Sequence, residues 1–530
     1  MKPHGWRTGA LTAALLTLGL TATPASAQKT LTFIPYSDLR VLDPLQTAAS
    51  ITTMHASNIY DQLFAWDANL LPKPQMVGNY SVSDDKLTYT MTLRPGLKWH
   101  DGTQVTTKDV IASLARWMKR DPIGRKMAES VAATAAVDAN TFTIKLKAPY
   151  SWVEYSLGNH AGNFPAMMRE KEAMTDPFTA VGADGQIGSG PYKFVASEWK
   201  PGAEIVYVKN TDYLPRAEPP DGMTGAKLVK VDRMVWKVIP DHQTAAAALI
   251  AGEVDMLDQP IADVLPQLER SKDLVVQRIQ PVGGFGFFRP NALHPPFNNP
   301  KARQALALIA PQSDFLAAAF GDKKWWNECY SYFVCGSVYG TTAGSESFQK
   351  PDPERAKQLL KEAGYNGEKI IAIGTKEIAS IGSITEVYVD ALRKIGVNVE
   401  LEMMDWGTMA SRFTSNKNPP GEKGGWHLFS ARGTWSTFHN PLTNLGTNMS
   451  PEGTWAGWAT DAEAETLRNE FIQAPTMEAR KAAVEKLHKR LWEVVPYIPI
   501  GQYLQPFAWR KTISGVLPTS QLVLWNISKE

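Results

Sequence analysis

Apolar and polar positions along the chain follow two periods, and each period predicts one kind of element. Strict alternation predicts short strands, and it is clearest at 88–93 and 141–146. Apolar residues three or four positions apart predict amphipathic helices, and the pattern Thr106-x-x-Asp109 resembles a capping box that starts one of them. Turn residues separate these segments. Further strands are expected at 31–36, 192–195 and 205–209, and a helix at 243–250 with Gly252 as its cap.

The second half of the chain predicts a regular alternation of strands and helices. Pro353 opens a helix that Gly364 ends. A strand at 369–373, a helix at 384–395 and a strand at 397–403 follow in that order. A strand–helix–strand unit of this kind joins two parallel strands, so it predicts an α/β fold. Two further amphipathic helices are expected at 462–472 and 477–492.

The first 27 residues have the order of a secretory signal peptide. Lys2 and Arg7 precede an apolar run at 10–20, and Ala25-Ser26-Ala27 is a small-x-small cleavage site. The apolar run is shorter than the ~20 residues that span a bilayer. We therefore expect export with cleavage after Ala27, and a short N-terminal membrane anchor is the less favoured alternative.

Size and charge narrow the class of protein. The chain has 530 residues, of which 44% are hydrophobic, and a chain of this length is expected to divide into two or more lobes. Removal of residues 1–27 takes away two basic residues and leaves 53 basic and 53 acidic residues. A balanced chain has no overall field that attracts nucleic acid, so we expect no nucleic-acid partner.

The cysteines and the absence of known catalytic motifs indicate which chemistry the chain can support. Cys329 and Cys335 are the only cysteines, and in an exported protein they predict one disulfide. A two-thiol metal site is the alternative, and it is disfavoured because no histidine lies nearby. The sequence lacks Gly-x-Ser-x-Gly, His-Glu-x-x-His and Cys-x-x-Cys. We therefore expect no enzyme, no cofactor and no metal site.

Four blocks of sequence carry a family resemblance. They are Leu42-Asp43-Pro44 with 59–63; 93–102 with Val105-Thr106 and 108–110; 188–192 with Lys209-Asn210 and Asp212-Tyr213; and Asn298 with Pro300 and 303–306. In order and spacing these blocks are similar to the extracellular solute-binding proteins of the dipeptide, oligopeptide and nickel importers, known as family 5. The resemblance extends along the whole mature chain.

The resemblance implies two α/β lobes joined by a hinge, the periplasmic binding protein fold, with an extra subdomain in the first lobe and the ligand between the lobes. Gly283-Gly284-Phe285-Gly286 is expected in one crossing segment, and the second is expected around 497–507. The implied organisation is a signal peptide at 1–27; lobe I at 28–64, 187–282 and 501–530; the extra subdomain at 65–186; and lobe II at 283–500.

The resemblance also implies a function. Such a protein is the periplasmic substrate-binding component of an ABC importer. It captures a short peptide or similar small polar solute and delivers it to permease subunits that work with an ATPase at the inner membrane. A ligand that contacts both lobes favours the closed state by its extra contacts. We expect a monomer.

The segment 430–441 raises a question about the ligand. In peptide-binding members, an acidic residue in the corresponding segment anchors the amino group of the ligand. Here Ser436 or Thr437 takes that place, and a hydroxyl cannot neutralise an ammonium group as a carboxylate does. Arg432 and His439 instead indicate an acidic or neutral polar ligand. An opine, organic acid, sugar derivative or metal chelate is therefore the alternative to a peptide, and a secreted hydrolase is a weaker alternative.

Six residues are predicted to contact the ligand, because they lie at a strand end, in the expected crossing segment, at a family position near the cleft or in the segment without the acid. Several are aromatic, and rigid amphipathic rings suit a ligand cleft. Substituting several of them is expected to weaken binding without unfolding the protein. They are Tyr36, Phe285, Trp406, Arg432, Trp435 and His439.

Overall fold

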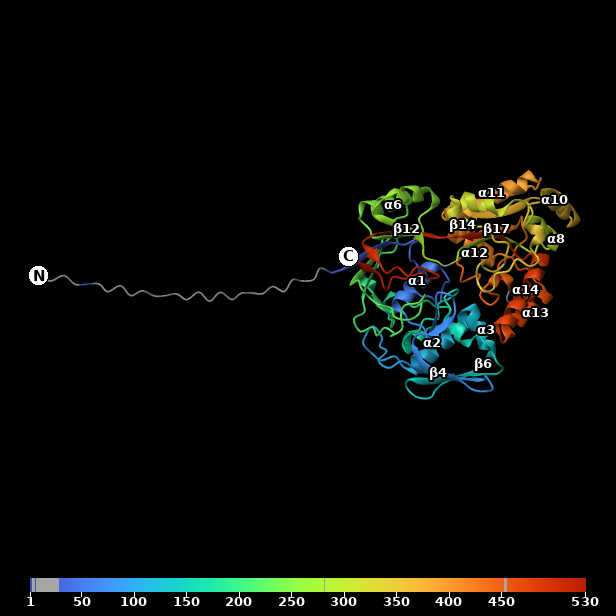
Figure 1. Cartoon of the computed structure of the whole chain (residues 1–530). Coiled ribbons are helices and arrows are strands. Elements are labelled where there is room, and N and C mark those ends of the chain that lie inside the picture. Colours follow the sequence, from blue (N-terminus) through green and yellow to red (C-terminus); the bar gives the residue numbers. More distant parts are fainter. Residues whose placement is uncertain (2–4, 6–27, 281, 452–454) are drawn as a thin grey trace.

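The structure, a computed structural model, describes Met1, Gly5 and residues 28–280, 282–451 and 455–530. The predicted signal peptide at 1–27 lies outside the described residues, apart from Met1 and Gly5. Two large β-sheets with accompanying helices organise the folded part (Figure 1). None of the helices in the described part of the chain combines the length and the apolar character that a bilayer crossing requires.

A seven-stranded mixed sheet draws strands from both ends of the chain. β1 pairs in parallel with β10 and β11, whereas β19 pairs antiparallel with β11 and β12. The predicted helix cap is confirmed, because Gly252 ends α6 with a φ of 81°. In sheet order the strands are β12 (Leu274–Arg278), β19 (Pro506–Arg510), β11 (Met256–Asp258), β1 (Thr30–Ile34), β10 (Arg233–Lys237), β9 (Glu204–Lys209) and β8 (Tyr192–Phe194), and the helices of this part are α1 (Ser50–Ile59), α6 (His242–Ala251) and α7 (Leu265–Arg270).

A six-stranded sheet forms the second large layer. The predicted crossover is confirmed, because β15 and β16 are parallel neighbours joined through α11. The sequence pattern missed β13, whose residues are all buried and therefore show no alternation. In sheet order the strands are β14 (Trp326–Asn327), β18 (Ile498–Tyr503), β13 (Gly284–Pro290), β17 (Leu428–Gly433), β15 (Ile370–Thr375) and β16 (Val399–Met404); the helices are α8 (Pro300–Leu306), α9 (Gln312–Phe320), α10 (Pro353–Glu362), α11 (Ala379–Lys394), α12 (Trp406–Ser415), α13 (Ala462–Gln473) and α14 (Met477–Val494).

A four-stranded antiparallel sheet lies apart from the two large sheets, at the bottom of Figure 1. The expected capping interaction starts its longest helix, because the backbone N–H of Thr106 donates to Asp109 Oδ2 at 2.8 Å. The strands in order are β4 (Val77–Val82), β5 (Thr88–Leu93), β7 (Thr141–Leu146) and β6 (Val131–Ala136), and the helices are α2 (Thr107–Arg120), α3 (Pro122–Ser130), α4 (Val153–Leu157) and α5 (Glu170–Ala173). Two ribbons complete the strands, β2 (Phe64–Trp66) with β3 (Pro72–Pro74) and β20 (Ile513–Ser514) with β21 (Ser528–Lys529).

The chain passes between the two large sheets twice. It leaves the seven-stranded sheet after β12 and enters the six-stranded sheet at β13, and it returns between β18 and β19. We call the part built on the seven- and four-stranded sheets lobe I and the part built on the six-stranded sheet lobe II. The residue boundaries of the lobes and of the extra subdomain stay predictions.

Two buried ion pairs explain acidic residues in the sequence blocks that carry the family resemblance. Asp43 accepts from Arg116 at 2.8 Å, and both side chains are almost fully buried. Asp61 accepts from Lys227 at 2.6 Å, also out of contact with solvent. Asp43 joins the N-terminal segment to α2, and Asp61 joins the end of α1 to the segment before β10. These residues therefore hold lobe I together and do not face a ligand.

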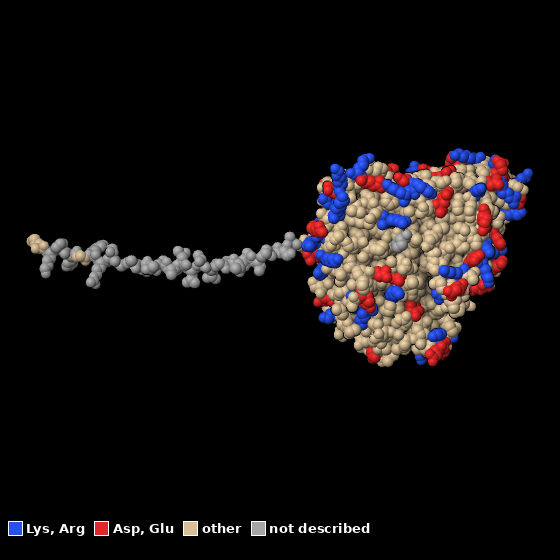
Figure 2. Space-filling view, viewed as in Figure 1, with Lys and Arg blue, Asp and Glu red and all other residues tan. Residues whose placement is uncertain are grey.

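The cysteines and the surface charges complete the description. Cys329 and Cys335 form the predicted disulfide. Basic and acidic side chains are interspersed over the face shown in Figure 2, and neither sign gathers there into a large field. This distribution agrees with the balanced charge of the mature sequence.

Candidate ligand-binding cleft

A cavity of about 1160 Å³ lies between the two lobes. Residues of both lobes and both crossing segments line it, so a molecule inside it lies between the two lobes. Its volume exceeds the ~300–1,000 Å³ that is typical of small-molecule sites. Among the residues that line it are Tyr36, Asp38, His160, Gln259, Gln280, Glu377, Trp406, Arg432, Trp455, Gln505 and Gln521.

Arg432 is the cation that connects the two lobes across this cavity. It lies on β17 of lobe II, and its guanidinium donates to Gln259 Oε1 of lobe I and to Gln505 Oε1 of the second crossing segment, both at 3.3 Å. The guanidinium carbon also lies 5.3 Å from the centroid of the Tyr503 ring. Both hydrogen-bond partners are neutral amides, and no carboxylate of the described residues forms an ion pair with Arg432. Its positive charge is therefore available to an anionic group.

Acidic groups lie on the lobe I side of the cavity. Asp38 follows β1; its Oδ2 accepts from Arg40 at 3.2 Å, while its buried Oδ1 has no hydrogen-bond partner within the described residues. Asp258 ends β11 and is almost fully buried. Burial raises the pKa of Asp258 to about 7, and the Tyr36 backbone N–H and Arg432 lower it only partly. Asp258 itself does not line the cavity; among the residues that do, lobe I supplies Asp38 with Arg40 and Arg120, and lobe II supplies Arg432 with Glu377.

Tyr36 and Trp406 line the cavity as well. The hydroxyl of Tyr36 accepts the backbone N–H of Ile51 at 3.0 Å, which fixes the ring against the start of α1. Trp406 begins α12, and its backbone N–H donates to Glu377 Oε2 at 2.9 Å. The structure therefore brings three predicted ligand contacts, Tyr36, Trp406 and Arg432, to one cavity.

Phe285 lies behind the cavity wall. It is fully buried on β13 and stacks on Phe438, with 5.2 Å between the ring centroids. Phe438 lines the cavity, and Phe285 packs against the ring of Phe438. The structure thus gives Phe285 a packing role, and its contact with a ligand stays a prediction.

Trp435 and His439 lie in the contact between lobe II and the four-stranded part of lobe I. The hydroxyl of Tyr155, on α4, lies 3.3 Å from His439 Nδ1 and accepts from Asn440 Nδ2 at 2.8 Å. Burial lowers the pKa of His439 to about 3, so this imidazole is neutral. Trp435 is buried beside it, with 6.1 Å between the rings. Neither side chain lines the cavity, and their predicted role in binding remains a prediction.

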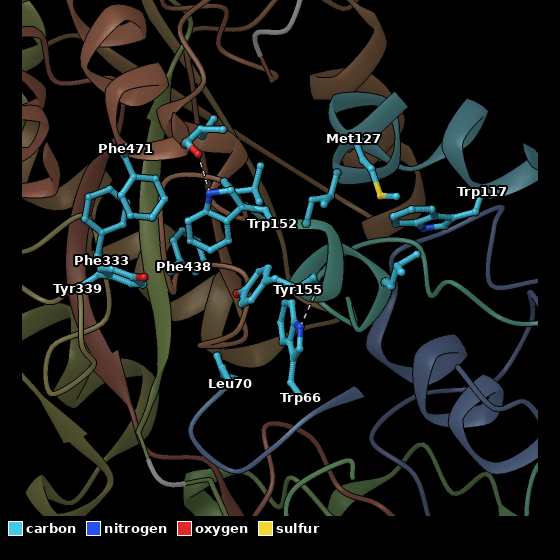
Figure 3. Packing of buried hydrophobic residues seen from close by; sticks show 14 of the residues in the cluster. Trp66, Leu70, Trp117, Met127, Trp152, Tyr155, Phe333, Tyr339, Phe438 and Phe471 are labelled. Atoms are coloured by element: carbon cyan, nitrogen blue, oxygen red, sulfur yellow. Dashed lines mark hydrogen bonds between the residues drawn. The ribbon is translucent and has the colours of Figure 1, made fainter. Parts of the chain in front are cut away.

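Trp152 contacts lobe II from the four-stranded part of lobe I. Its indole N–H donates to the backbone oxygen of Ile472 at 2.8 Å, and its ring packs 5.1 Å from Phe471 (Figure 3). The guanidinium of Arg480 lies 4.2 Å from the same ring. Elsewhere Lys324 of lobe II pairs with Glu269 of lobe I at 2.7 Å. The lobes therefore meet through both apolar and charged contacts.

Replacing Trp152 with alanine is expected to loosen this contact in the ligand-free protein. A buried tryptophan at an interface contributes about 2 kcal/mol or more, so amide exchange along α13 (Ala462–Gln473) should become roughly 30-fold faster. Hydrogen–deuterium exchange read out by mass spectrometry measures this directly. Trp199→Ala is the control, because Trp199 packs on Phe194 within lobe I. Unchanged exchange along α13 in Trp152→Ala would show that the lobes do not hold each other here in solution.

Three hydroxyl groups of the cavity wall occupy the segment in which the family resemblance leads one to expect an acid. Thr434 Oγ1 lies 2.9 Å from Ser436 Oγ and 3.2 Å from Thr437 Oγ1. These hydroxyls satisfy one another and supply no negative charge. A cationic ligand group therefore finds its counter-charge elsewhere in the cavity, and Asp38 is the acidic residue there with a free buried oxygen.

Sequence reasoning missed the glutamines that face the cavity. Gln259, Gln280 and Gln505 follow strand ends or lie in the crossing segments, and His160 and Gln521 come from irregular segments. No periodicity marks such positions, because each depends on the packing of segments far apart in sequence. The one available signal was the end of β1, which places Asp38 beside Tyr36 at the edge of the sheet where ligands bind.

Two lobes, two crossing segments and a cavity between them define the two-lobed periplasmic binding protein fold. The dipeptide-binding protein of Pseudoalteromonas sp. SM9913, solved with Met-Leu, has this fold; it matches with a TM-score of 0.78 at 20% identity over 95% of this chain and 100% of that chain. AgaA from A. tumefaciens R10, solved with agropinic acid, also matches with a TM-score of 0.78, at 22% identity over 94% of this chain and 99% of that chain. The predicted fold class is therefore confirmed.

The chain belongs to the bacterial extracellular solute-binding proteins, family 5, whose sequence profile matches residues 72–455. The probable peptide ABC transporter periplasmic-binding protein y4tO of Sinorhizobium fredii is 41% identical over 512 residues, which cover 96% of this chain and 94% of the relative. The glutathione-binding protein GsiB of Pectobacterium atrosepticum is 29% identical over 406 residues, which cover 76% and 74%. The predicted family is thereby confirmed, and these relatives are named as binding proteins.

Proposed function

We propose that this chain is the periplasmic substrate-binding component of an ABC importer and that it captures short peptides between its lobes. The ligand-filled closed form would then dock on permease subunits, and an associated ATPase would supply the energy. Support comes from the family, from the name of the relative that is 41% identical over nearly the whole chain, and from the chemistry of the cavity. Export and signal-peptide cleavage after Ala27 are part of the proposal.

Arg432 is the observation that carries the proposal. A guanidinium has five N–H donors, and here only two neutral amide oxygens at 3.3 Å engage it. Charge-assisted bonds to a carboxylate are shorter and roughly twice as strong, so a carboxylate in the cavity competes well with these amides. Because Arg432 belongs to lobe II and Gln259 to lobe I, a carboxylate bound here draws the lobes together.

The opposite wall suits the other end of a peptide. Asp38 presents a buried, unpartnered carboxylate oxygen within the same cavity. A peptide carries an ammonium and a carboxylate, and the cavity places the free oxygen of Asp38 on lobe I and the guanidinium of Arg432 on lobe II. Asp38 of lobe I can therefore take the role of the acidic residue that the segment 430–441 lacks.

An opine or another carboxylate without a peptide's free ammonium is the second candidate. The hydroxyls of Thr434, Ser436 and Thr437 favour it, because they offer hydrogen bonds without charge to polyol or carboxylate groups. Both candidates share a carboxylate on Arg432, and they differ in the need for an ammonium group.

Thermal unfolding of residues 28–530 against a matched panel tests the proposal. The panel contains di- to pentapeptides, the same peptides as C-terminal amides, and opines, sugars, organic acids and metal chelates. Free-acid peptides are expected to raise the melting temperature with concentration, because a ligand at 100 times its Kd adds about 2.7 kcal/mol to the stability of the folded state. Their amides should shift it far less. Mass spectrometry should recover the peptides intact.

Shifts confined to opines or other non-peptide acids would replace the peptide with the second candidate. Equal shifts by acids and amides would show that Arg432 does not bind the carboxylate. Cleaved peptides would contradict a purely binding function.

A further inference from the structure

Four polar residues of lobe I and the first crossing segment gather around Ser520 at the edge of the cavity. Gln280 Nε2 donates to the backbone oxygen of Ser520 at 2.9 Å, and His160 Nε2 hydrogen-bonds the Ser520 hydroxyl. Gln521 follows Ser520 in the chain. All four residues line the cavity, and each is more than nine-tenths buried. We call them the Ser520 cluster.

Three polar atoms of the Ser520 cluster have no hydrogen-bond partner within the described residues. They are Gln280 Oε1, Gln521 Nε2 and His160 Nδ1. Leaving such a group buried and unbonded costs about 1–3 kcal/mol, so native proteins rarely do it without a partner. Their place in the cavity wall makes a bound molecule the natural partner.

The chemistry of these free atoms is defined by their neighbours. The backbone oxygen of Ser520 can only accept, which fixes the amide of Gln280 with its nitrogen toward Ser520 and leaves its acceptor oxygen without a partner. Burial lowers the pKa of His160 to about 4, so its ring is neutral near pH 7. The ring also packs 4.5 Å from Trp66, which holds it in place. The Ser520 cluster is therefore uncharged and contains both an acceptor and a donor.

We propose that the Ser520 cluster binds an amide group of the ligand, whose N–H donates to Gln280 Oε1 and whose C=O accepts from Gln521 Nε2. This inference rests on the proposed function, because a peptide unit or a carboxamide side chain supplies such a group. A carboxylate would face the oxygen of Gln280 and is disfavoured there. The cluster belongs to lobe I and its crossing segment, so it receives the ligand before closure brings Arg432 to the carboxylate.

The test compares amide with ester in the same position. The probes are the peptide that gives the largest thermal shift with the wild type and its depsipeptide analogues, in which one amide N–H at a time is replaced by an ester oxygen. Calorimetry should show one ester that the wild type binds roughly tenfold or more weakly, because the buried oxygen of Gln280 loses its donor. In Gln280→Met that ratio should fall to about one. Gln521→Met, which leaves the contact between Gln280 and Ser520 intact, should weaken the parent peptide.

Gln267→Met is the matched control, because Gln267 is half-buried on α7, away from the cavity lining, and its amide bonds Gln243 on the surface of lobe I. It should keep the wild-type ratio. A wild type that binds peptides, with the same amide-to-ester ratio in Gln280→Met and no loss in Gln521→Met, would show that the cluster holds only water. The inference would then fall while the proposed function stands. Absence of any peptide binding by the wild type would overturn both.

Discussion

Replacing Arg432 with glutamine is expected to weaken the binding of a free-acid peptide by about 100-fold or more. The substitution removes the cation that faces the cavity and leaves the carboxylate of the ligand enclosed without a counter-charge. Loss of one partner of a buried, hydrogen-bonded charge pair costs about 2–5 kcal/mol, and about 1.4 kcal/mol corresponds to tenfold in affinity. Isothermal titration calorimetry with a peptide and its C-terminal amide measures the effect.

Comparing the free-acid peptide with its C-terminal amide tests specifically whether Arg432 binds the carboxylate. The variant should bind the acid and the amide with similar affinity, whereas the wild type should prefer the acid. The fold should survive, because the two hydrogen bonds that Arg432 makes are long and their partners are neutral. Arg270→Gln is the control, since Arg270 is exposed at the end of α7. An unchanged preference for the acid in Arg432→Gln would place the carboxylate at another residue.

Replacing Asp43 with alanine is expected to lower the free energy of unfolding by about 3–5 kcal/mol, because it leaves the guanidinium of Arg116 buried without its carboxylate. Asp43 Oδ2 also accepts the backbone N–H of Val181 at 2.8 Å, so the variant also leaves an unpaired amide near residue 181. Urea unfolding of the ligand-free protein measures the change as a lower midpoint.

Two comparisons separate the pair from a general effect of losing charge. Glu354→Ala removes an exposed pair with Lys357 and should change the free energy of unfolding by less than about 1 kcal/mol. The double variant Asp43→Leu with Arg116→Met should recover much of the loss, because an apolar pair needs no compensation. If Asp43→Ala unfolds at the wild-type midpoint, the pair does not hold α2 to the N-terminal segment.

The acidic residues of the family motifs show that these motifs carry information about the fold. Asp43 and Asp61 belong to blocks that identify the family, yet both are bound to buried cations and neither lines the cavity. Such motifs predict the fold because they stabilise it. They do not predict the ligand, which depends on side chains in segments that the motifs leave out.

Some residues of the cleft could be predicted from sequence, because their position in an element or their chemical type marks them. Tyr36 follows the first strand, and the edge of an α/β sheet where strands end is a general place for ligands. Trp406 begins a helix after a strand and lies at a comparable edge. Arg432 was singled out by its charge in a segment that lacks an acid. For these residues, position in an element and chemical type were enough to place them at the cavity.

Trp435 and His439 show where such reasoning stopped. They are neighbours of Arg432 in sequence, but they turn toward Tyr155 of the four-stranded part of lobe I. The contact joins segments more than 280 residues apart. No pattern of apolar and polar residues encodes which face of a loop meets the other lobe.

The sequence by itself determined the elements whose signals are local. Thr106 and Asp109 start α2, Gly252 ends α6, and the order of β15, α11 and β16 implies a parallel pair, because capping and periodicity act over a few residues. Only the tertiary structure decided the composition of the cleft. Gln259 and Gln280 follow β11 and β12, and Gln505 precedes β19, which lies between those two strands and runs antiparallel to both. The three glutamines therefore reach one cavity from the same end of neighbouring strands, and only the packing of distant segments into one sheet brings them together.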